Sequence, residues 1–243
     1  MLCGDNPTDG KIMPIPFRVM SSEMLIAVPV KPFGVAKRRL APVLDAEQRS
    51  RVGKAVAAHV IGKAQTTGGE VAVITGDSGV SSWAGRLGAG VIPEPGAGGL
   101  NRAAAAAVRE ARRQGRAWMI LHADLPALTE SELHAARAAL PPRGVLLVPS
   151  HNGGTSLIAG DLEFFPFAYG PVSFRRHLAT AARLPLRVLV RPGMAIDLDG
   201  PEDLAAVVRL PAGRWLADLI PSTEETLQPS RSGPGAPTSL AQP

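Results

Sequence analysis

Short apolar runs alternate with amphipathic segments between residues 24 and 210, and this alternation limits most strongly how the chain can fold. Continuous apolar runs are typical of strands that are buried on both faces, and apolar residues at helical spacing indicate helices that cover a sheet. We expect strands at 24–30, 70–76, 90–92, 117–124, 144–150, 155–159 and 186–190. We expect helices at 45–65, 80–88, 100–115, 129–140, 173–184 and 201–210. The pattern predicts a three-layer α/β/α, Rossmann-like domain with a mostly parallel sheet.

Local signals mark the ends of several of these helices. Asp45 stands where an N-cap is expected, and Thr129 with Glu132 has the spacing of a capping box. Gly115 ends the Ala-rich helix expected at 100–115, where a C-terminal glycine is favoured. Pro201 lies in the first turn of the last helix.

The two ends of the chain differ from the part between them. Residues 1–22 mix Gly, Pro, Asp and Ser without periodicity, which predicts a flexible leader. Residues 221–243 are rich in Pro, Ser, Gly and Thr, which predicts a disordered tail. We therefore expect a single domain over residues 23–220.

Composition excludes several classes of protein. The single cysteine, Cys3, excludes an internal disulfide framework and a cysteine-based zinc site. No apolar run approaches the roughly 20 residues of a membrane span, and residues 1–23 have no signal-peptide core, so a cytoplasmic enzyme without a membrane partner is expected. A net charge of +5 and a pI of about 10.0 raise nucleic acid as an alternative partner. Ten aromatic residues offer few stacking surfaces, and acids interrupt the basic residues outside one loop, which disfavours that alternative.

Ligands of open α/β sheets bind beyond the carboxyl ends of the strands, so the loops after strands are where chemistry is expected. The loop at 28–42 carries Lys31, Lys37, Arg38 and Arg39 without one acid. Lys and Arg side chains with backbone N–H groups suit a polyphosphate. Neither a Walker A nor a G-x-G-x-x-G pattern is present, and a solvated basic loop is the alternative.

Two further loops carry aspartates. Asp124 directly follows an apolar strand and could hold Mg²⁺, which binds hard oxygen ligands, although an ordinary turn or N-cap aspartate is an equal alternative. Asp197 and Asp199 are one residue apart, so on an extended segment they point to the same face. Paired like charges favour a bound cation, and a capped turn is the alternative. Glu202 and Asp203 are expected in the first turn of the following helix.

The fourth region combines residues 150–159 with residues 167–177. Thr155 follows two glycines, and Gly170 and Ser173 lie at the start of a predicted helix. Amides, hydroxyls and a helix N-terminus together predict a site for a small phosphate or carboxylate. Turn glycines and an N-cap serine are the alternative.

The histidines show no metal-ligand spacing and no pattern of nucleophilic catalysis. We expect His59, His122 and His134 to be structural or surface residues. His151 and His177 flank the predicted anion site and are weaker candidates for it.

Taken together, these motifs resemble the 2-phospho-L-lactate/phosphoenolpyruvate guanylyltransferases of coenzyme F-420 biosynthesis, which belong with the molybdenum-cofactor guanylyltransferases among the nucleotidyltransferases. The most specific motif is V-K-P-x-x-x-A-K-x-R-L-A-P at 30–42. The others follow in the family's order: G-L-N at 99–101, D-L-P at 124–126, G-G-T at 153–155, G-P-x-S at 170–173 and D-x-D-x-P-E-D-L at 197–204. The family often has Asn where this chain has Ser156.

The resemblance implies a fold of the nucleotide-diphospho-sugar transferase type and a role for each motif. The implied Mg²⁺ ligands are Asp124, Asp197 and Asp199. The implied residues for the acceptor acid are Thr155, Gly170 and Ser173. The implied nucleotide-binding residues are Lys31, Lys37, Arg39 and Asn101. Lys37, Asp124 and Asp199 would be the catalytic residues.

The implied reaction is the transfer of GMP from GTP to the phosphate of a three-carbon phospho-acid. Phosphoenolpyruvate is the leading acceptor, and 2-phospho-L-lactate and 3-phosphoglycerate are alternatives. A molybdopterin or sugar phosphate is a further alternative, which the absence of a glycine-rich L-A-G-G-x-S-x-R-M-G first loop disfavours. The product would pass to a downstream deazaflavin transferase, and an unpaired sheet edge would permit a homodimer.

Overall fold

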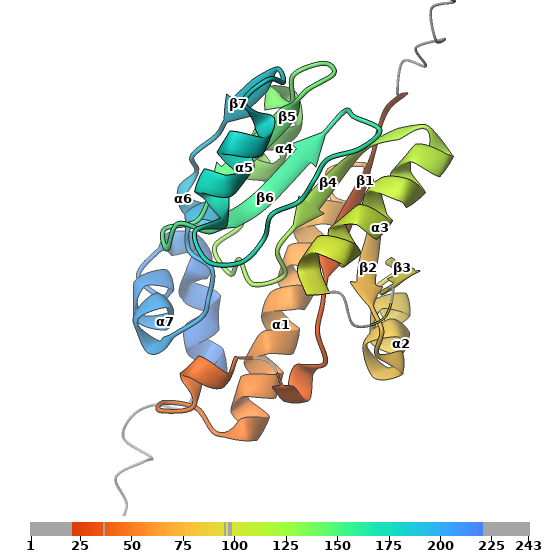
Figure 1. The fold of residues 1–243 in the computed structure, drawn as a ribbon. Coiled ribbons are helices and arrows are strands. Elements are labelled where there is room, and N and C mark those ends of the chain that lie inside the picture. Colours follow the sequence, from red (N-terminus) through yellow and green to blue (C-terminus); the bar gives the residue numbers. More distant parts are fainter. Residues whose placement is uncertain (1–20, 36, 95, 97–98, 221–243) are drawn as a thin grey trace, which may run out of the picture.

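A computed structural model describes residues 21–35, 37–94, 96 and 99–220 of the chain. Seven of its strands form one sheet in the order β3-β2-β1-β4-β6-β5-β7 (Figure 1). The strands are β1 (Ser21–Pro29), β2 (Glu70–Thr75), β3 (Gly90–Pro93), β4 (Arg116–Leu121), β5 (Val145–Pro149), β6 (Thr155–Gly160) and β7 (Leu186–Val188). Only β6 runs against the others in this sheet, because β4 and β5 both pair with it antiparallel while all the other pairs are parallel. The mostly parallel sheet expected from the sequence is confirmed.

Two of the helices begin where the capping signals at Asp45 and Thr129 place them. The Asp45 side chain accepts from the Gln48 N–H at 2.8 Å, and Thr129 and Glu132 form the second capping box. The helices are α1 (Ala46–Gln65), α2 (Ser78–Arg86), α3 (Gly99–Gln114), α4 (Glu130–Ala139), α5 (Ser173–Ala181), α6 (Pro192–Ala195) and α7 (Pro201–Val207). Gly115 follows α3 with φ +70°, a left-handed conformation that glycine adopts without steric cost.

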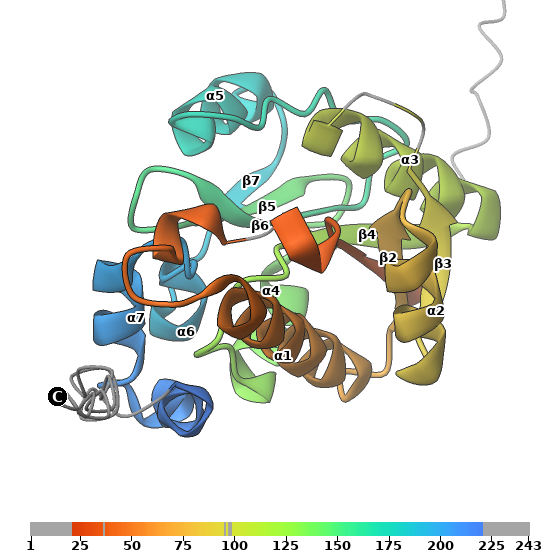
Figure 2. The same ribbon diagram turned by 90° about the horizontal axis from the view of Figure 1, so that it is seen from below.

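The helices lie on both faces of the sheet. Figure 2 shows α3 and α5 on one side of the sheet and α1, α4 and α6 on the other. Alternate residues of β1 divide accordingly: Ile26 packs in the core with α1 and α4, and Leu25 packs in the core with α3. Burying an apolar side chain of this size stabilises the fold by about 1.5–3 kcal/mol. The two cores therefore stabilise the layered arrangement. The predicted three-layer architecture is confirmed.

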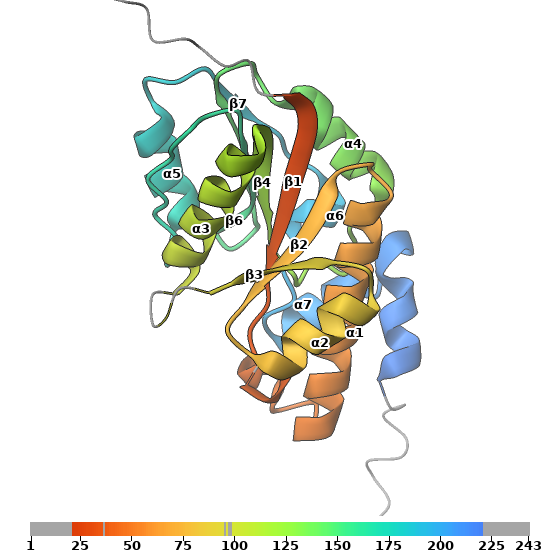
Figure 3. The same cartoon turned by 90° about the vertical axis from the view of Figure 1, so that its right-hand side faces the viewer.

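A third, smaller core lies beyond the sheet. Leu40 and Leu44 from the loop after β1 pack with Val52 of α1, with Leu198 and with residues of α7. The short helical segment η3 (Pro211–Leu219) lies beside α1 (Figure 3), where Trp215 stacks on His59 at a ring-centroid distance of 5.0 Å. This core fixes the loop after β1 relative to the segment that precedes α7.

Several element boundaries differ from those expected. β1 begins at Ser21, because Ser21 pairs with Arg116, whereas the domain was expected to begin at residue 23. The strand expected at 117–124 spans Arg116–Leu121 in the structure, and its last register pair with β6 is Leu121 with Leu157. Helices α6 and η3 were not expected. Residues 1–20 of the leader predicted at 1–22, and the tail predicted at 221–243, lie outside the described residues.

Within the part of the chain that the structure describes, no helix combines the length and the apolar composition needed to cross a bilayer. β3 and β7 form the two edges of the sheet. The homodimer permitted by such an edge stays a prediction.

Candidate active site

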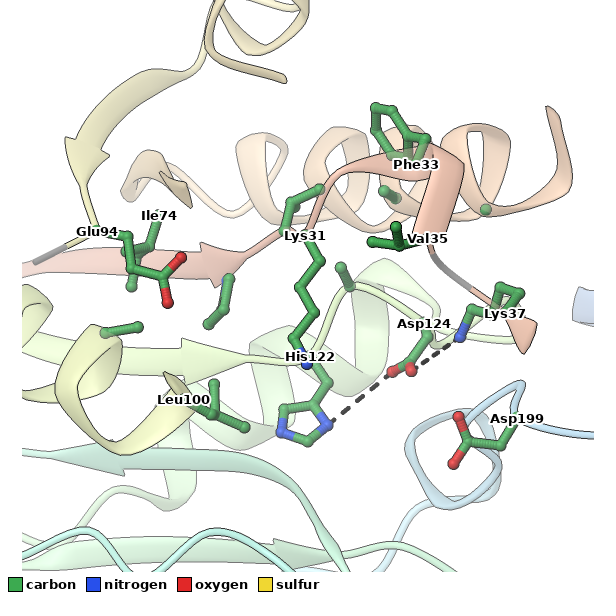
Figure 4. Close-up of a pocket in the computed structure, with 16 residues that line it drawn as sticks. Lys31, Phe33, Val35, Lys37, Ile74, Glu94, Leu100, His122, Asp124 and Asp199 are labelled. Carbon is green, nitrogen blue, oxygen red and sulfur yellow. Dashed lines mark hydrogen bonds and ion pairs between the residues drawn. The ribbon is translucent and has the colours of Figure 1, made fainter. Parts of the chain in front are cut away.

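A pocket of about 360 Å³ opens at the carboxyl ends of β1 and β4. β1 pairs with β2 on one side and with β4 on the other. The next two strands of the chain, β2 and β3, continue the sheet on one side of β1, and the later strands continue it on the other side. Ligands of open α/β sheets bind at such a switch point. Figure 4 shows Lys31, Lys37, His122, Asp124 and Asp199 around the pocket. Three of the four loops singled out in the sequence therefore contribute a residue to one pocket.

The loop after β1 places Lys37 across this pocket. Two short 3-10 segments, η1 (Phe33–Val35) and η2 (Arg38–Leu40), flank Lys37, which has a left-handed backbone with φ +56°. A non-glycine residue holds this conformation only where the surrounding structure fixes it. The Lys37 Nζ donates to Asp124 Oδ2 at 2.9 Å and to the Leu198 carbonyl at 2.6 Å. One lysine thus joins the loops that follow β1 and β4 and the segment before α7.

Asp124 is the acid that follows β4. Its backbone carbonyl accepts from the Leu198 N–H at 2.9 Å, which holds the D-x-D segment beside it. Burial raises the pKa of Asp124, but the positive charge of Lys37, aided by His122, outweighs burial and leaves the pKa below its ordinary value. Oδ2 is bonded to Lys37, whereas Oδ1 is buried and has no hydrogen-bond partner among the described residues. Asp124 is therefore an ionised carboxylate with one oxygen available to a ligand.

Asp199 lies opposite Asp124 in the pocket (Figure 4). Its side chain is 40% exposed, and Oδ2 lies 3.6 Å from the Arg39 guanidinium at the rim. Burial and the negative charges of Asp124 and Asp197 raise the pKa of Asp199, although Lys37 and Arg39 oppose this rise. Two carboxylates that repel each other across a pocket favour a bound cation.

Asp197 has different partners from Asp199. It is 8% exposed, and its two oxygens accept from the Asn152 amide at 3.1 and 3.0 Å. His151 Nδ1 lies 3.4 Å from Asp197, and His151 Nε2 lies 3.0 Å from Asp203. Asp203 in turn accepts from the backbone N–H groups of Asp199 and Gly200, which confirms its expected place in the first turn of α7. These contacts tie the glycine-containing loop after β5 to the D-x-D segment.

The three predicted metal ligands do not form a complete metal site by themselves. Within the described ranges, no three His, Cys, Asp or Glu side chains are grouped so that they could hold a metal ion. Asp124 and Asp199 line the pocket, and Asp197 lies behind them against Asn152.

The predicted anion site forms a second group of residues. Thr155 begins β6 and Ser173 begins α5, and their hydroxyl oxygens lie 3.2 Å apart. Both side chains are buried. Gly170 has φ +127°, and a Cβ there would lie 2.8 Å from Arg176 Nη2, so a larger residue is strained at this position. Val172, not Ser173, is the N-cap of α5. Thr155 and Ser173 are thus close together, and Gly170 lies just before the helix that carries Ser173.

Asn101 connects the two groups. It lies in the first turn of α3, where its Oδ1 accepts from the Tyr169 N–H at 2.7 Å and its Nδ2 donates to the Tyr169 carbonyl at 3.4 Å. Its neighbour Leu100 lines the pocket. Asn101 therefore holds the segment before Gly170 against α3, and its predicted contact with the nucleotide stays a prediction.

His122 was expected to be structural or at the surface, and the structure places it at the pocket. The residue lines the pocket, with Nδ1 3.9 Å from Asp124 Oδ1. Its Nε2 is buried and has no hydrogen-bond partner in the part of the chain that the structure describes. The available signal was its position at the end of an apolar strand, two residues before Asp124. The contacts of His151 and Asn152 with the D-x-D segment were also missed, because they join residues about 45 positions apart.

The opposite pKa shifts of the two pocket aspartates predict opposite effects on stability. Because the pKa of Asp124 is lowered, its ionised form stabilises the fold above the ordinary pKa of 3.8, and this contribution is lost as the pH falls through the folded value. Asp124→Asn should therefore lower the free energy of unfolding by about 2 kcal/mol at neutral pH. Because the pKa of Asp199 is raised, its ionised form destabilises the fold at neutral pH. Asp199→Asn should raise the free energy of unfolding, by less than about 1 kcal/mol because the group is partly exposed.

Denaturant unfolding at neutral pH and at about pH 4 measures both effects. The effect of Asp199→Asn should shrink at about pH 4, because the raised pKa of Asp199 lets this carboxylate take up a proton there. The effect of Asp124→Asn should largely persist at that pH and be lost only as the pH falls below 3.8 through the lowered pKa of Asp124. A stabilised Asp124→Asn, or a destabilised Asp199→Asn, would contradict the assigned environments.

Comparison with known proteins agrees with these features. The family model described as "Guanylyl transferase CofC like" matches residues 24–234. A phosphoenolpyruvate guanylyltransferase of Nocardia farcinica is 39% identical over 204 residues, which are 79% of this chain and 88% of that protein. A 2-phospho-L-lactate guanylyltransferase of Methanopyrus kandleri is 32% identical over 185 residues, which are 74% of this chain and 89% of that protein.

Among solved structures, a nucleotidyl transferase from Methanothermobacter thermautotrophicus has the same fold. Its TM-score is 0.55 at 14% identity, and the match covers 82% of this chain and all of that one. The match of the family model to most of the chain, together with relatives above 30% identity, decides the family. This chain belongs to the CofC-like guanylyl transferases.

Proposed function

We propose that this chain transfers GMP from GTP to the phosphate of phosphoenolpyruvate, giving enolpyruvoyl-2-diphospho-5′-guanosine and pyrophosphate in coenzyme F-420 biosynthesis. The observation that carries the proposal is the pocket in which Lys37 bridges Asp124 and Leu198 while Asp199 faces them. Nucleotidyl transfer from a triphosphate needs such a combination of a fixed positive side chain and acidic ligands for a metal ion. The names of the relatives at 39% and 32% identity supply GTP chemistry and the acceptor class.

The nucleotide is proposed to occupy the pocket with its phosphates at the loop after β1. Lys31 and Lys37 line the pocket and Arg39 lies at its rim, so three positive charges can meet the triphosphate. An oxygen of the acceptor phosphate attacks the α-phosphorus of GTP and forms a new P–O bond. The bond between the α-phosphorus and the bridging oxygen to the β-phosphorus breaks, and pyrophosphate leaves with that electron pair. Lys37 stabilises the negative charge that develops on the leaving group.

No strong general base is needed for this attack. The second ionisation of a phosphate monoester has a pKa of about 6, so the acceptor oxygen is already deprotonated at neutral pH. Catalysis then depends on bringing two anions together and on neutralising their charge. This agrees with a pocket whose charged side chains are lysines and acids, with His122 as its one titratable ring among the described lining residues.

The donor set in the pocket fits a divalent cation, and we propose Mg²⁺. A cation held by Asp124 and Asp199 would give the unbonded Asp124 Oδ1 a partner. It would also reduce the repulsion between carboxylates that raises the pKa of Asp199. Mg²⁺ uses few carboxylates and keeps waters or phosphate oxygens as its other ligands, which suits a site without a complete protein ligand set. When bound, it would neutralise phosphate charge and polarise the phosphorus under attack. Asn152 would orient Asp197, since each carboxylate oxygen has a second lone pair free for the ion.

The acceptor acid is proposed to bind at Thr155, Gly170 and Ser173. Two buried hydroxyls and the N-terminus of α5 suit its phosphate or carboxylate. Phosphoenolpyruvate, 2-phospho-L-lactate and 3-phosphoglycerate share these two anionic groups, so the choice among them depends on the atoms between the groups.

The proposal is tested by pyrophosphate release from GTP with each of the three acids in turn, with and without Mg²⁺. We expect release with phosphoenolpyruvate, weaker release with the other two acids, and none after chelation of the metal. Release only with a molybdopterin or a sugar phosphate would place the chain with the other nucleotidyltransferases. No release with any acid would reject the function.

A further inference from the structure

A histidine lies behind the two hydroxyls of the proposed acceptor site. His177 of α5 is fully buried, and its ring contacts the rings of Phe165 and Tyr169 at centroid distances of 6.1 and 4.8 Å. Both ring nitrogens have partners: Nε2 lies 2.9 Å from the Ala168 backbone nitrogen, and Nδ1 lies 2.9 Å from Thr155 Oγ1. The proposed mechanism gives this ring no role.

The partner at Nε2 fixes the tautomer of the ring. A backbone N–H can only donate, so Nε2 must offer a lone pair to Ala168 and cannot carry a proton. Burial, with added repulsion from Arg176 and His122, lowers the pKa of His177 to about 4. The ring is therefore neutral near pH 7, and its single proton is on Nδ1.

The tautomer in turn restricts the direction of the Thr155 hydroxyl. Because Nδ1 carries the proton, His177 donates to Thr155 Oγ1, and the Thr155 hydroxyl proton must point away from the ring. Ser173 Oγ lies 3.2 Å from Thr155 Oγ1, so one of these hydroxyls donates to the other and the pair has one proton left to donate elsewhere. A carboxylate or phosphate only accepts hydrogen bonds, so it binds best to hydroxyls that are already set to donate. Without the donor at Nδ1, the Thr155 hydroxyl could turn toward the ring instead.

We propose that His177 is a positioning residue that keeps the Thr155 hydroxyl from donating to the ring, so that the hydrogen-bonded pair of Thr155 and Ser173 has a proton to donate to the anionic acceptor acid. The inference rests on the proposed function, which places the acceptor at these two hydroxyls. His177 touches neither substrate and acts through Thr155.

Two amide substitutions separate this role from simple filling of space. Asn places its amide nitrogen where Nδ1 lies and can keep the bond to Thr155, whereas Gln reaches the Nε2 position and can keep the bond to Ala168 alone. We expect His177→Gln to raise the KM for the acceptor about tenfold, the equivalent of one lost hydrogen bond, and to leave the KM for GTP within about twofold. His177→Asn should stay close to the wild type in both. If the KM for the acceptor rose equally in the two variants, or if the KM for GTP rose in parallel with it, the ring would have only a packing role.

A double-mutant cycle tests the route through Thr155. Thr155→Val removes the hydroxyl that His177 orients, so adding His177→Gln to it should cause little further rise in the KM for the acceptor. Independent, multiplying effects of the two substitutions would overturn the inference.

A measurement on the wild-type chain covers the case in which the variants do not fold. In ¹⁵N spectra of the histidine-labelled protein, assigned by comparison with His177→Asn or by triple-resonance methods, Nδ1 of His177 should be protonated and Nε2 should not. This state should persist between about pH 6 and pH 8. A proton on Nε2 would overturn the inference. If the wild-type protein turns over and His177→Gln has an unchanged KM for the acceptor, this inference alone is overturned. If the wild-type protein shows no turnover, the proposed function is overturned.

Discussion

Asp124→Asn and Asp199→Asn should each lower kcat for GMP transfer by about 10³-fold or more, while both variants keep the fold. Asparagine has nearly the shape of aspartate and lacks the charge. At residue 124 the change removes the ionised partner of Lys37 and the unbonded oxygen Oδ1. At residue 199 it removes the second carboxylate that faces the pocket. Both substitutions should therefore weaken the binding of the divalent cation as well as turnover.

Steady-state kinetics at saturating GTP, with the Mg²⁺ concentration varied, measures both effects. Asp218→Asn is a matched control, because Asp218 is exposed in η3 and does not line the pocket. Circular dichroism distinguishes loss of function from loss of fold. Near-normal turnover in both pocket variants would contradict the assignment of Asp124 and Asp199 to the cation.

Lys37→Met should lower kcat/KM for GTP by about 10²- to 10³-fold. The Lys37 side chain is 10% exposed and joins Asp124 to the Leu198 carbonyl, so its charge lies at a fixed position inside the pocket. A fixed charge aimed at a leaving group costs no reorganisation during the reaction, and methionine supplies similar bulk without that charge. Part of the loss should appear in kcat, because charge develops on pyrophosphate only as the bond breaks.

Arg38→Met in the same loop is the control for this variant. Arg38 is adjacent to Lys37 and exposed, and it does not line the pocket. If the loop acted only as a diffuse positive surface, the two substitutions would have similar and salt-dependent effects. A Lys37→Met variant as active as Arg38→Met would therefore exclude a specific role for Lys37.

The architecture was predictable because local and global signals in the sequence agree. The helix α1 has its N-cap at Asp45 and buried valines at helical spacing, and the apolar runs of β1 and β4 have the length of buried strands. The short elements α6 and η3 each begin with a proline, but neither has a side-chain cap hydrogen bond. η3 is held by tertiary contacts such as Trp215 on His59, which come from a distant helix.

The loops of the site were predictable as well, because parallel strands direct their carboxyl ends to one edge of the sheet. The pairing of their side chains was not. Lys37 reaches Leu198, 161 positions away, and His177 reaches Thr155, 22 positions away. Asp197 and Asp199 look equivalent in the sequence motif. In the structure Asp197 accepts a hydrogen bond from Asn152, whereas Asp199 lines the pocket. Residue types indicated the chemistry, and only the fold assigns the partners.

The most direct test of the proposed reaction follows the oxygen atoms of the acceptor. Phosphoenolpyruvate labelled with ¹⁸O at the non-bridging phosphate oxygens would be incubated with GTP, Mg²⁺ and the protein, and the products analysed by mass spectrometry. If the acceptor phosphate attacks the α-phosphorus, all of the label appears in the guanylylated product and the pyrophosphate contains none. Label in pyrophosphate or in free phosphate, or a product without GMP, would contradict GMP transfer to the acceptor phosphate.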